Sequence, residues 1–304
     1  MNAIDTLVAR GRGRVEEHAP FGARTTYRVG GSARLWANLS SLADLNELGE
    51  LMLETGLEWV CVGNGSNLLI ADDERDVLAV HLIDELAGLS WRDDDASVVV
   101  NAGAGLDLPI AARRLSGEGV IDFEWAVGVP GTVGGALAMN AGGHGSDIAA
   151  CIEEATLWRH GALETWTKEQ LALGYRTSAV GPSDLVVAAT LRLARGDAEV
   201  SKERLREVVR WRREHQPGGT NAGSVFRNPP GDHAARLIEA AGCKGLRLAS
   251  AQVSEKHANF IQADAHGNAQ DVFTLMALVR ARVLEDSGVS LILENRFVGF
   301  EVTP

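Results

Sequence analysis

The chain has 304 residues, a formal net charge of −12, and contains 45% hydrophobic and 23% charged residues. This length exceeds what one hydrophobic core usually holds, so we expect two or three packed units. The acidic balance and the lack of a long Lys/Arg-rich run argue against a nucleic-acid binder. No apolar stretch is long enough to span a membrane, and the first residues lack the apolar run of a signal peptide. We therefore expect an acidic cytoplasmic protein.

The three cysteines, Cys61, Cys151 and Cys243, lie far apart and show no CxxC spacing. Neither a zinc site nor a disulfide framework is expected from an odd number at these separations, and we predict no metal site. Each cysteine has apolar or glycine neighbours, so we expect all three to be buried and to pack as small residues in a reducing compartment.

Apolar spacing and turn residues predict alternating helices and strands in the first two thirds of the chain. Helices are expected at 4–10, 41–56 and 108–119, and strands at 25–31, 58–63, 76–83, 97–105, 153–160 and 184–194. The composition changes near residue 195, where a charged segment predicts an exposed helix over 195–217. Helices at 234–242 and 269–288 and strands at 251–254, 259–263 and 289–300 follow. The fold class is α+β, with a boundary near 195.

Two glycine-rich segments indicate a ligand site. GNGSNLL (63–69) directly follows a predicted strand, and its backbone N–H groups can form a concavity for an anion. Taken alone, this segment fits a plain strand end equally well. GVPGTVGGALAMNAGG (128–143) offers a backbone with few side chains, against which a flat or charged ligand can lie. A close crossing of two backbones is the alternative, but two such segments, both expected after strands, favour a diphosphate.

Neither segment is a common nucleotide fingerprint. GxxxxGK[ST] is absent, so phosphate-loop chemistry is unsupported, and no GxGxxG stands where a strand–helix unit needs it. The sequence therefore indicates a dinucleotide site that is not of the Rossmann type.

Seven segments, in the same order, give the chain its resemblance to a known family. They are TTYRVGG (25–31), GNGSNLL (63–69), GVPGTVGGALAMNAGG (128–143), YRTS (175–178), AGSVFRNP (222–229), VSEKHANFI (253–261) and LENR (293–296). With these segments the chain resembles the UDP-N-acetylenolpyruvoylglucosamine reductases, or UDP-N-acetylmuramate dehydrogenases. Little room is left over 177–223 for the extra active-site loop of the longer branch, so the chain resembles the shorter one.

The resemblance implies an FAD-binding domain of the vanillyl-alcohol-oxidase type, followed by a substrate domain. The implied ranges are 1–70 and 71–195 for the two FAD subdomains and 196–304 for the substrate domain, whose last strand can return to the FAD domain. It also implies NADPH-dependent reduction of an enolpyruvyl ether on a UDP-sugar, giving UDP-N-acetylmuramate for peptidoglycan synthesis. The sequence alone does not show whether the protein prefers NADPH or NADH. We expect the protein to be a monomer.

The resemblance also assigns residues to the reaction. Ser224 becomes the proton donor, Arg176 the residue on the substrate carboxylate and the developing enolate, and Glu294 the third catalytic residue. Without the resemblance, Ser224 reads as a turn serine, Arg176 as a surface ion-pair residue, and Glu294 as a structural partner of Arg296 on one strand face.

Cofactor and substrate contacts are implied as well. The expected FAD contacts are Gly63, Asn64, Gly65, Ser66, Asn67 and Leu68 in the first glycine segment, and Gly128, Pro130, Gly131, Thr132, Gly134, Gly135 and Asn140 in the second. Asn228, Lys256 and His257 are candidate substrate contacts, Lys256 being suited to a diphosphate. His257 fits a core histidine equally well.

Several positions depart from the family pattern. Ala249 and Ser250 stand where a glycine pair is frequent, Gln262 and Ala263 replace a Val-Asn pair, and Asn295 occupies a usually apolar place. Two other functions stay open at this point. Because the two glycine segments need only FAD, one is a flavin oxidase or dehydrogenase of the same fold acting on another substrate. The departures at 249–250 and 262–263 leave open a non-catalytic UDP-sugar binding protein.

Overall fold

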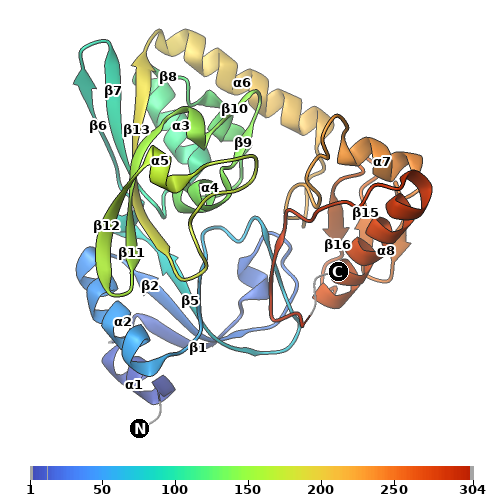
Figure 1. The fold of residues 1–304 in the computed structure, drawn as a ribbon, viewed down its shortest axis with the longest axis horizontal. Coiled ribbons are helices and arrows are strands. Elements are labelled where there is room, and N and C mark those ends of the chain that lie inside the picture. Colours follow the sequence, from blue (N-terminus) through green and yellow to red (C-terminus); the bar gives the residue numbers. More distant parts are fainter. Residues whose placement is uncertain (1–2, 12, 302–304) are drawn as a thin grey trace. The chain divides into compact units, whose positions relative to one another are not determined.

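The structure, a computed structural model, describes residues 3–11 and 13–301. The chain forms two compact units, drawn in Figure 1 and described separately below. Unit 1 comprises Met1–Glu17, Leu35–Asn64 and Val77–Arg212, and unit 2 comprises His18–Arg34, Gly65–Asp76 and Arg213–Pro304. Both units contain helices and strands, which confirms the α+β class.

The first sheet has four strands, and most of its residues belong to unit 1. The strand order is β1 (Val15–Ala19), β2 (Ala33–Leu39), β5 (Arg75–Leu82) and β3 (Trp59–Cys61). The unit also contains α1 (Ala3–Arg10) and α2 (Leu42–Thr55). Helix α2 begins at Ser41, whose hydroxyl accepts a hydrogen bond from the Asp44 N–H at 3.2 Å, and ends at Gly56, whose φ is +63°.

The second sheet of unit 1 is antiparallel. Its order is β12 (Ala162–Thr167), β11 (Ile152–Arg159), β13 (Leu185–Arg195), β7 (Ser97–Gly103) and β6 (Leu89–Asp94), and β8 (Val120–Ile121) also pairs with β13. Strand β13 is largely buried in the middle of the sheet, which accounts for its almost continuous apolar sequence.

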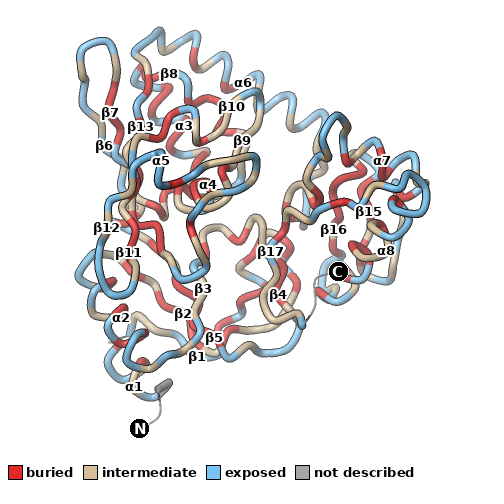
Figure 2. The backbone as a smooth tube through the Cα atoms, in the orientation of Figure 1, coloured by how far each residue is buried: buried red, intermediate tan, exposed pale blue. Residues whose placement is uncertain are grey.

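Short helices and one hairpin complete unit 1. They are η2 (Asp84–Ala87), α3 (Leu108–Gly117), η3 (Glu124–Gly128), α4 (Val133–Met139), β9 (Gly142–Gly143), β10 (Ser146–Asp147), η4 (Ile148–Ala150) and α5 (Lys168–Leu171). The longer helix α6 (Ala198–His215) lies in unit 1 as far as Arg212 and continues into unit 2. Helices α3 and α4 lie beside the second sheet (Figure 1). Apolar side chains from both sheets and these helices form one core. Figure 2 colours the buried residues of the chain red.

Unit 2 has a core of its own. It contains η1 (Gly22–Arg24), α7 (Ala234–Ala240), α8 (Ala269–Ser287), a sheet of β14 (Arg247–Leu248), β15 (Ala251–Val253) and β16 (Ile261–Ala263), and the pair β4 (Leu68–Ile70) and β17 (Arg296–Val298). Strand β17 runs parallel to β4, with Arg296 opposite Leu68. The last strand thus joins a segment that lies in the range expected for the first FAD subdomain.

The expected domain ranges divide the chain differently from the two units. The boundary expected near 195 falls next to α6, while residues 18–34 and 65–76 join the C-terminal part. Residues 1–2 and 302–304, at the ends of the expected ranges, lie outside the described residues. The division into FAD and substrate domains therefore stays a prediction about function.

Two predicted strands are wrong in whole or in part. Residues 25–31 form turns, because Arg28 has a φ of +55° and Gly30 approaches the Ile70 carbonyl too closely for a side chain: an added Cβ would lie 2.3 Å from that oxygen. Of the strand predicted at 289–300, only Arg296–Val298 forms. Glu294 precedes it, so the expected shared strand face for Glu294 and Arg296 is also wrong.

Two smaller expectations also need correction. The glycine segment 128–143 follows the 3-10 turn η3 rather than a strand. Cys61 is exposed because β3 lies at the edge of its sheet, whereas Cys151 and Cys243 are buried as expected. No helix among the described residues is long and apolar enough to cross a bilayer.

Candidate active site

The two glycine segments meet inside unit 1. A Cβ added to Gly63 would lie 2.5 Å from the Thr132 hydroxyl oxygen, so only glycine permits this approach. The Asn64 side chain donates a hydrogen bond to the Asp107 carboxylate, and Asp107 forms an antiparallel bridge with Thr132. Asp107 therefore lies between the segments and contacts both of them.

Helix α4 carries the middle of the second glycine segment. Its first three N–H groups already have acceptors: Val133 donates to the Leu106 carbonyl at 2.9 Å, Gly134 to the Ala104 carbonyl at 2.9 Å, and Gly135 to the Thr132 hydroxyl at 3.4 Å. Gly135 is exposed, and an added Cβ there would meet only Thr132, at 3.6 Å. The surface left for a ligand is thus the bare backbone of this turn rather than its helix N–H groups.

The remaining predicted glycines of this segment differ in their surroundings. Gly134 packs against Ala104, since an added Cβ would come within 2.9 Å of the Ala104 Cβ. Gly128 faces His144 and Val208, each of which an added Cβ would approach to 3.0 Å. Pro130 is exposed and Gly131 half-buried. Pro130, Gly131 and Gly135 therefore form the open part of the segment, and Gly128 and Gly134 have packing reasons to be glycine.

The second half of GNGSNLL belongs to unit 2. Gly65 has a φ of +59°, and an added Cβ would lie 2.7 Å from the Thr25 Cα. The Asn67 side chain donates to the Glu294 carbonyl at 2.9 Å and accepts from the Asn295 amide at 2.9 Å. Ser66 and Leu68 are half-buried, and Leu68 begins β4. Asn67 therefore holds the segment that contains Glu294.

Ser224 and Glu294 lie on adjoining segments of unit 2. The Glu294 N–H donates to the carbonyl of Val225 at 2.7 Å, and Phe226 forms a bridge with Leu293. Buried Asn259 fixes the same loop, because its Oδ1 accepts from the Phe226 N–H at 2.9 Å and its Nδ2 donates to the Phe226 carbonyl at 2.8 Å. Two of the three predicted catalytic residues are thus brought together by the backbone.

Arg176 belongs to unit 1 and lies in a tight turn with a φ of +56°. Its guanidinium donates to the Gly142 carbonyl at 2.9 Å and to the Asn140 carbonyl at 3.4 Å. The Tyr175 ring centre lies 5.5 Å from the guanidinium carbon, and Tyr175 is 58% exposed. The arginine therefore contacts the end of the second glycine segment.

The three candidate substrate contacts lie in unit 2 and have partners there. The Asn228 side chain accepts from the Ala234 N–H at the start of α7 at 3.0 Å. Lys256 donates to the carbonyl of Arg213. His257 is half-buried against Phe260, with ring centres 4.8 Å apart, and burial lowers the pKa of its imidazole. These contacts fit structural roles, and binding roles for the three residues stay predictions.

Three residues near these segments were not singled out from the sequence. Asp107 follows a strand that ends in glycine, and Tyr175 precedes Arg176 in a motif already noted, so both had a local indication. Asn259 had none, because its hydrogen bonds join positions 33 residues apart.

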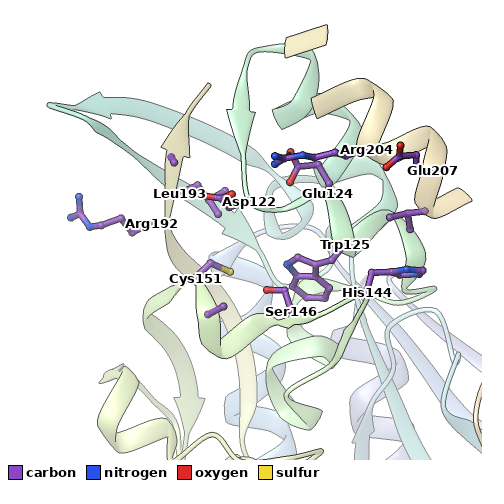
Figure 3. Close-up of a pocket in the computed structure, with 13 residues that line it drawn as sticks. Asp122, Glu124, Trp125, His144, Ser146, Cys151, Arg192, Leu193, Arg204 and Glu207 are labelled. Carbon is purple, nitrogen blue, oxygen red and sulfur yellow. Dashed lines mark ion pairs between the residues drawn. The ribbon is translucent and has the colours of Figure 1, made fainter. Parts of the chain in front are cut away.

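A cavity of about 690 Å³ lies elsewhere in unit 1 (Figure 3). Trp125, His144, Cys151 and residues from β13 and α6 line it, and none of the predicted site residues is among them. Burial, together with the nearby Arg212 charge, lowers the pKa of His144. The cavity adjoins the start of the second glycine segment through His144 and Val208, which Gly128 faces, and its lining contains neither Gly63 nor Thr132.

Comparison with known proteins defines the class first. Residues 34–161 match the model of an FAD binding domain. This range contains the first glycine segment and the second up to its end, including the meeting of Gly63 with Thr132. The open backbone at Gly131 and Gly135 suits a ligand that lies against the chain. The protein is thus an FAD-binding oxidoreductase.

The family follows from matches over nearly the whole chain. Residues 215–298 match the C-terminal domain of UDP-N-acetylenolpyruvoylglucosamine reductase. The chain is 39% identical over 295 residues to UDP-N-acetylenolpyruvoylglucosamine reductase 2 of Symbiobacterium thermophilum, covering 96% of this chain and 94% of that one. A Rubrobacter xylanophilus relative of the same name is 38% identical over 282 residues, covering 92% and 94%.

A solved structure agrees with these matches. The crystal structure of the reductase (MurB) from Thermus caldophilus aligns with a TM-score of 0.80 at 33% identity, covering 94% of this chain and 99% of that one. The chain therefore belongs to the UDP-N-acetylenolpyruvoylglucosamine reductase family. This confirms the resemblance found from the seven sequence motifs.

Proposed function

We propose that this protein reduces the enolpyruvyl ether of a UDP-N-acetylglucosamine to UDP-N-acetylmuramate, with NADPH as the electron source. The names of its relatives support this substrate. The observation that carries the proposal is the hydrogen bond from Glu294 to Val225, which brings the segments of Ser224 and Glu294 together. When bound, FAD supplies the hydride chemistry. The product serves peptidoglycan synthesis, and a cytoplasmic location remains a prediction.

The reaction is a conjugate reduction. A hydride adds to the β-carbon of the enolpyruvyl group, and the electron pair of the double bond moves onto the α-carbon and into the carboxylate. A proton must then reach the α-carbon. The protein therefore needs a group that stabilises an enolate and a positioned proton donor.

Arg176 is proposed to stabilise the enolate. A guanidinium stays charged and has five N–H donors, so its bonds to Asn140 and Gly142 are compatible with a bidentate grip on a carboxylate. These two carbonyls also restrict where the guanidinium can lie. Its charge favours the form of the substrate in which negative charge has moved into the carboxylate.

Ser224 is proposed to donate the proton to the α-carbon, and Glu294 to orient that hydroxyl and polarise the intermediate. A serine hydroxyl is a weak acid, so it can act only from a fixed position. Hydrogen bonds at Val225 and Phe226 fix the backbone immediately after Ser224. The Asn67 bond to the Glu294 carbonyl fixes the other segment.

The test is Ser224→Ala in purified protein carrying FAD. NADPH should still reduce the flavin at the normal rate, while turnover of the enolpyruvyl substrate should fall by about 10²–10⁴-fold. Ser287→Ala, in the last turn of α8, is the control in the same unit and should leave turnover unchanged.

Other outcomes would change the assignment. Unchanged turnover in Ser224→Ala would remove this serine from the mechanism. Protein that binds no FAD and stays inactive when FAD is supplied would overturn the proposed function. Rapid flavin reduction by an alcohol or sugar, with no response to NADPH, would instead indicate an oxidase or dehydrogenase of the same fold. Turnover rates measured in parallel with NADPH and with NADH will show which coenzyme the protein uses.

A further inference from the structure

Asn140 ends helix α4 in a left-handed conformation, with φ 40° and ψ 58°. Its N–H donates to the Leu137 carbonyl at 3.3 Å, and the residue is 3% exposed. Asparagine tolerates this conformation better than most residues, which explains why it can stand at the end of the helix. The sequence had suggested Asn140 as an FAD contact.

The Asn140 side chain is fully engaged within unit 1. Its Nδ2 donates to the Gly174 carbonyl at 2.9 Å and to the Asp147 carboxylate at 3.2 Å, and its Oδ1 accepts from the Ala149 N–H at 3.1 Å. Both amide hydrogens and the amide oxygen are therefore used. The side chain joins the end of α4 to the turn that begins at Gly174.

That turn contains Arg176. Gly174 and Thr177 exchange two backbone hydrogen bonds, of 3.0 and 3.1 Å, and hold Arg176 at a positive φ. A non-glycine residue in this conformation is strained and persists only where its surroundings fix it. The guanidinium then returns to the Asn140 carbonyl at 3.4 Å and the Gly142 carbonyl at 2.9 Å.

Asn140 thus acts on Arg176 in two ways: its side chain holds Gly174, the first residue of the turn, and its carbonyl accepts a hydrogen bond from the guanidinium. Ser178 adds another hydrogen bond between α4 and the segment after this turn, since its hydroxyl donates to the Ala138 carbonyl at 2.9 Å. Carbonyl groups at a helix C-terminus carry partial negative charge, which suits a cation.

We propose that Asn140 is a positioning residue that sets the place of the Arg176 guanidinium for the substrate carboxylate. This inference rests on the proposed function, because it needs Arg176 to act on that carboxylate. The glycine-rich segment then has two tasks. Its first half meets the GNGSNLL loop, and its last residues, Asn140 and Gly142, hold the arginine.

Asn140→Gly tests the proposal. Glycine keeps the left-handed backbone and the carbonyl but removes all three side-chain hydrogen bonds. Affinity of the oxidised enzyme for the enolpyruvyl UDP-sugar, measured by titration calorimetry, should fall by about 10–100-fold, the scale of a small misplacement. Affinity for UDP-N-acetylglucosamine, which lacks the enolpyruvyl carboxylate, should not change. Flavin reduction by NADPH should also persist.

Two further variants complete the design. His160→Gly is the matched control, because His160 is an exposed turn residue whose φ is +49°. This change also places a glycine at a left-handed position, but away from the turn that contains Arg176. Asn140→Asp keeps an acceptor for Ala149 but cannot donate to the Gly174 carbonyl when ionised. It should therefore share the selective loss, and it provides the test if the glycine variant folds poorly.

The outcomes separate the inference from the proposed function. In an Arg176→Ala background, Asn140→Gly should cause no further loss, because both changes act on the same guanidinium. Equal weakening of both ligands, or unchanged selectivity in Asn140→Gly, overturns the positioning role. If Arg176→Ala itself leaves substrate binding and turnover intact, the proposed role of Arg176 fails instead.

Discussion

At the scale of single residues, Asn295 shows how one buried amide joins two loops. Its Nδ2 donates to the Asn67 side chain at 2.9 Å and to the Ala222 carbonyl at 3.2 Å. It therefore joins the loop after β3 to the loop that contains Ser224. The buried Asn295 Oδ1 has no hydrogen-bond partner among the described residues, and this reduces the net stability that the two Nδ2 hydrogen bonds contribute.

Asn295→Val should lower the free energy of unfolding by about 1 kcal/mol, because two acceptors lose a donor while the orphaned oxygen disappears. Urea unfolding with FAD in excess measures this. Asn67→Ala breaks the same link, so the two changes should not be additive. A valine variant more stable than the parent would show that the amide serves no stabilising purpose here.

Gly63→Ala is the second residue-scale prediction. The new Cβ would lie 2.5 Å from the Thr132 hydroxyl oxygen, so the helix cap or the loop must move. We expect a loss of about 1–3 kcal/mol in stability and a lower content of bound flavin after purification. Gly218→Ala, at a position with open space, is the control. Full flavin content in Gly63→Ala would show that the two glycine loops need not touch.

At the scale of elements, the N-terminus of helix α8 is stabilised by a residue that is far away in the sequence. Asn268 accepts from the Asp271 N–H at 2.8 Å, which is a local cap. The Asp72 carboxylate, far away in sequence, accepts from the Ala269 and Gln270 N–H groups at 2.8 and 3.0 Å. Negative charge at this end of a helix is favourable.

Asp72→Ala should therefore cost about 1–2 kcal/mol of stability, since it removes two acceptors and one favourable charge. Hydrogen exchange should show faster opening of the first turn of α8, and Asp73→Ala should not. If the first turn stayed equally protected in both variants, Asn268 alone would account for the cap.

Local patterns predicted the helices better than the strands. Helices α2 and α8 were both predicted from their apolar spacing, and the structure adds an N-cap before each of them and a glycine after it. Strand β2 was missed, since its ARLWANL sequence is buried on both faces and does not alternate. The turns at 25–31 were missed because they depend on Ile70, a residue distant in sequence.

The candidate site was also predicted only in part. The residues named from motifs, such as Ser224 and Glu294, do lie together, but the sequence could not show what joins them. The bond from Asn67 to Glu294 spans 227 positions. Several residues assigned to ligands from the motifs, Asn67 and Asn140 among them, have side chains that hold other segments.

At the scale of the whole molecule, unit 2 joins segments that the expected domain ranges had separated. Residues 65–76, from the expected FAD part, share one compact unit with Ser224, Glu294 and α8. Sequence order alone suggests separate domains, because residues 77–212 intervene. The pairing of β4 with β17 makes one unit of the two segments, so a cut at 195 would leave β4 without its partner.

Acid stability is the last prediction at this scale. Arg236 and the His233 N–H lower the pKa of Asp232 to about 2, and Arg247 lowers the pKa of Asp264. Arg192 does the same for Asp94 in unit 1. The folded protein thus holds fewer protons than the unfolded chain, whose aspartates titrate near pH 3.9. The contribution of these carboxylates is complete above that pH and is lost as the pH falls toward 2.

The midpoint of urea unfolding should begin to fall below about pH 7, because His144 and His257 have lowered pKa values in the folded protein, and it should fall further between about pH 4 and 2 as the carboxylates take up protons. Measurements use a fixed excess of FAD, so that flavin loss does not add to the slope. Asp232→Asn should make the fall shallower, because one group no longer takes up a proton on unfolding. A midpoint that stays level from pH 4 to 2 would mean that these exposed ion pairs are absent in solution and that the carboxylates titrate as in the unfolded chain.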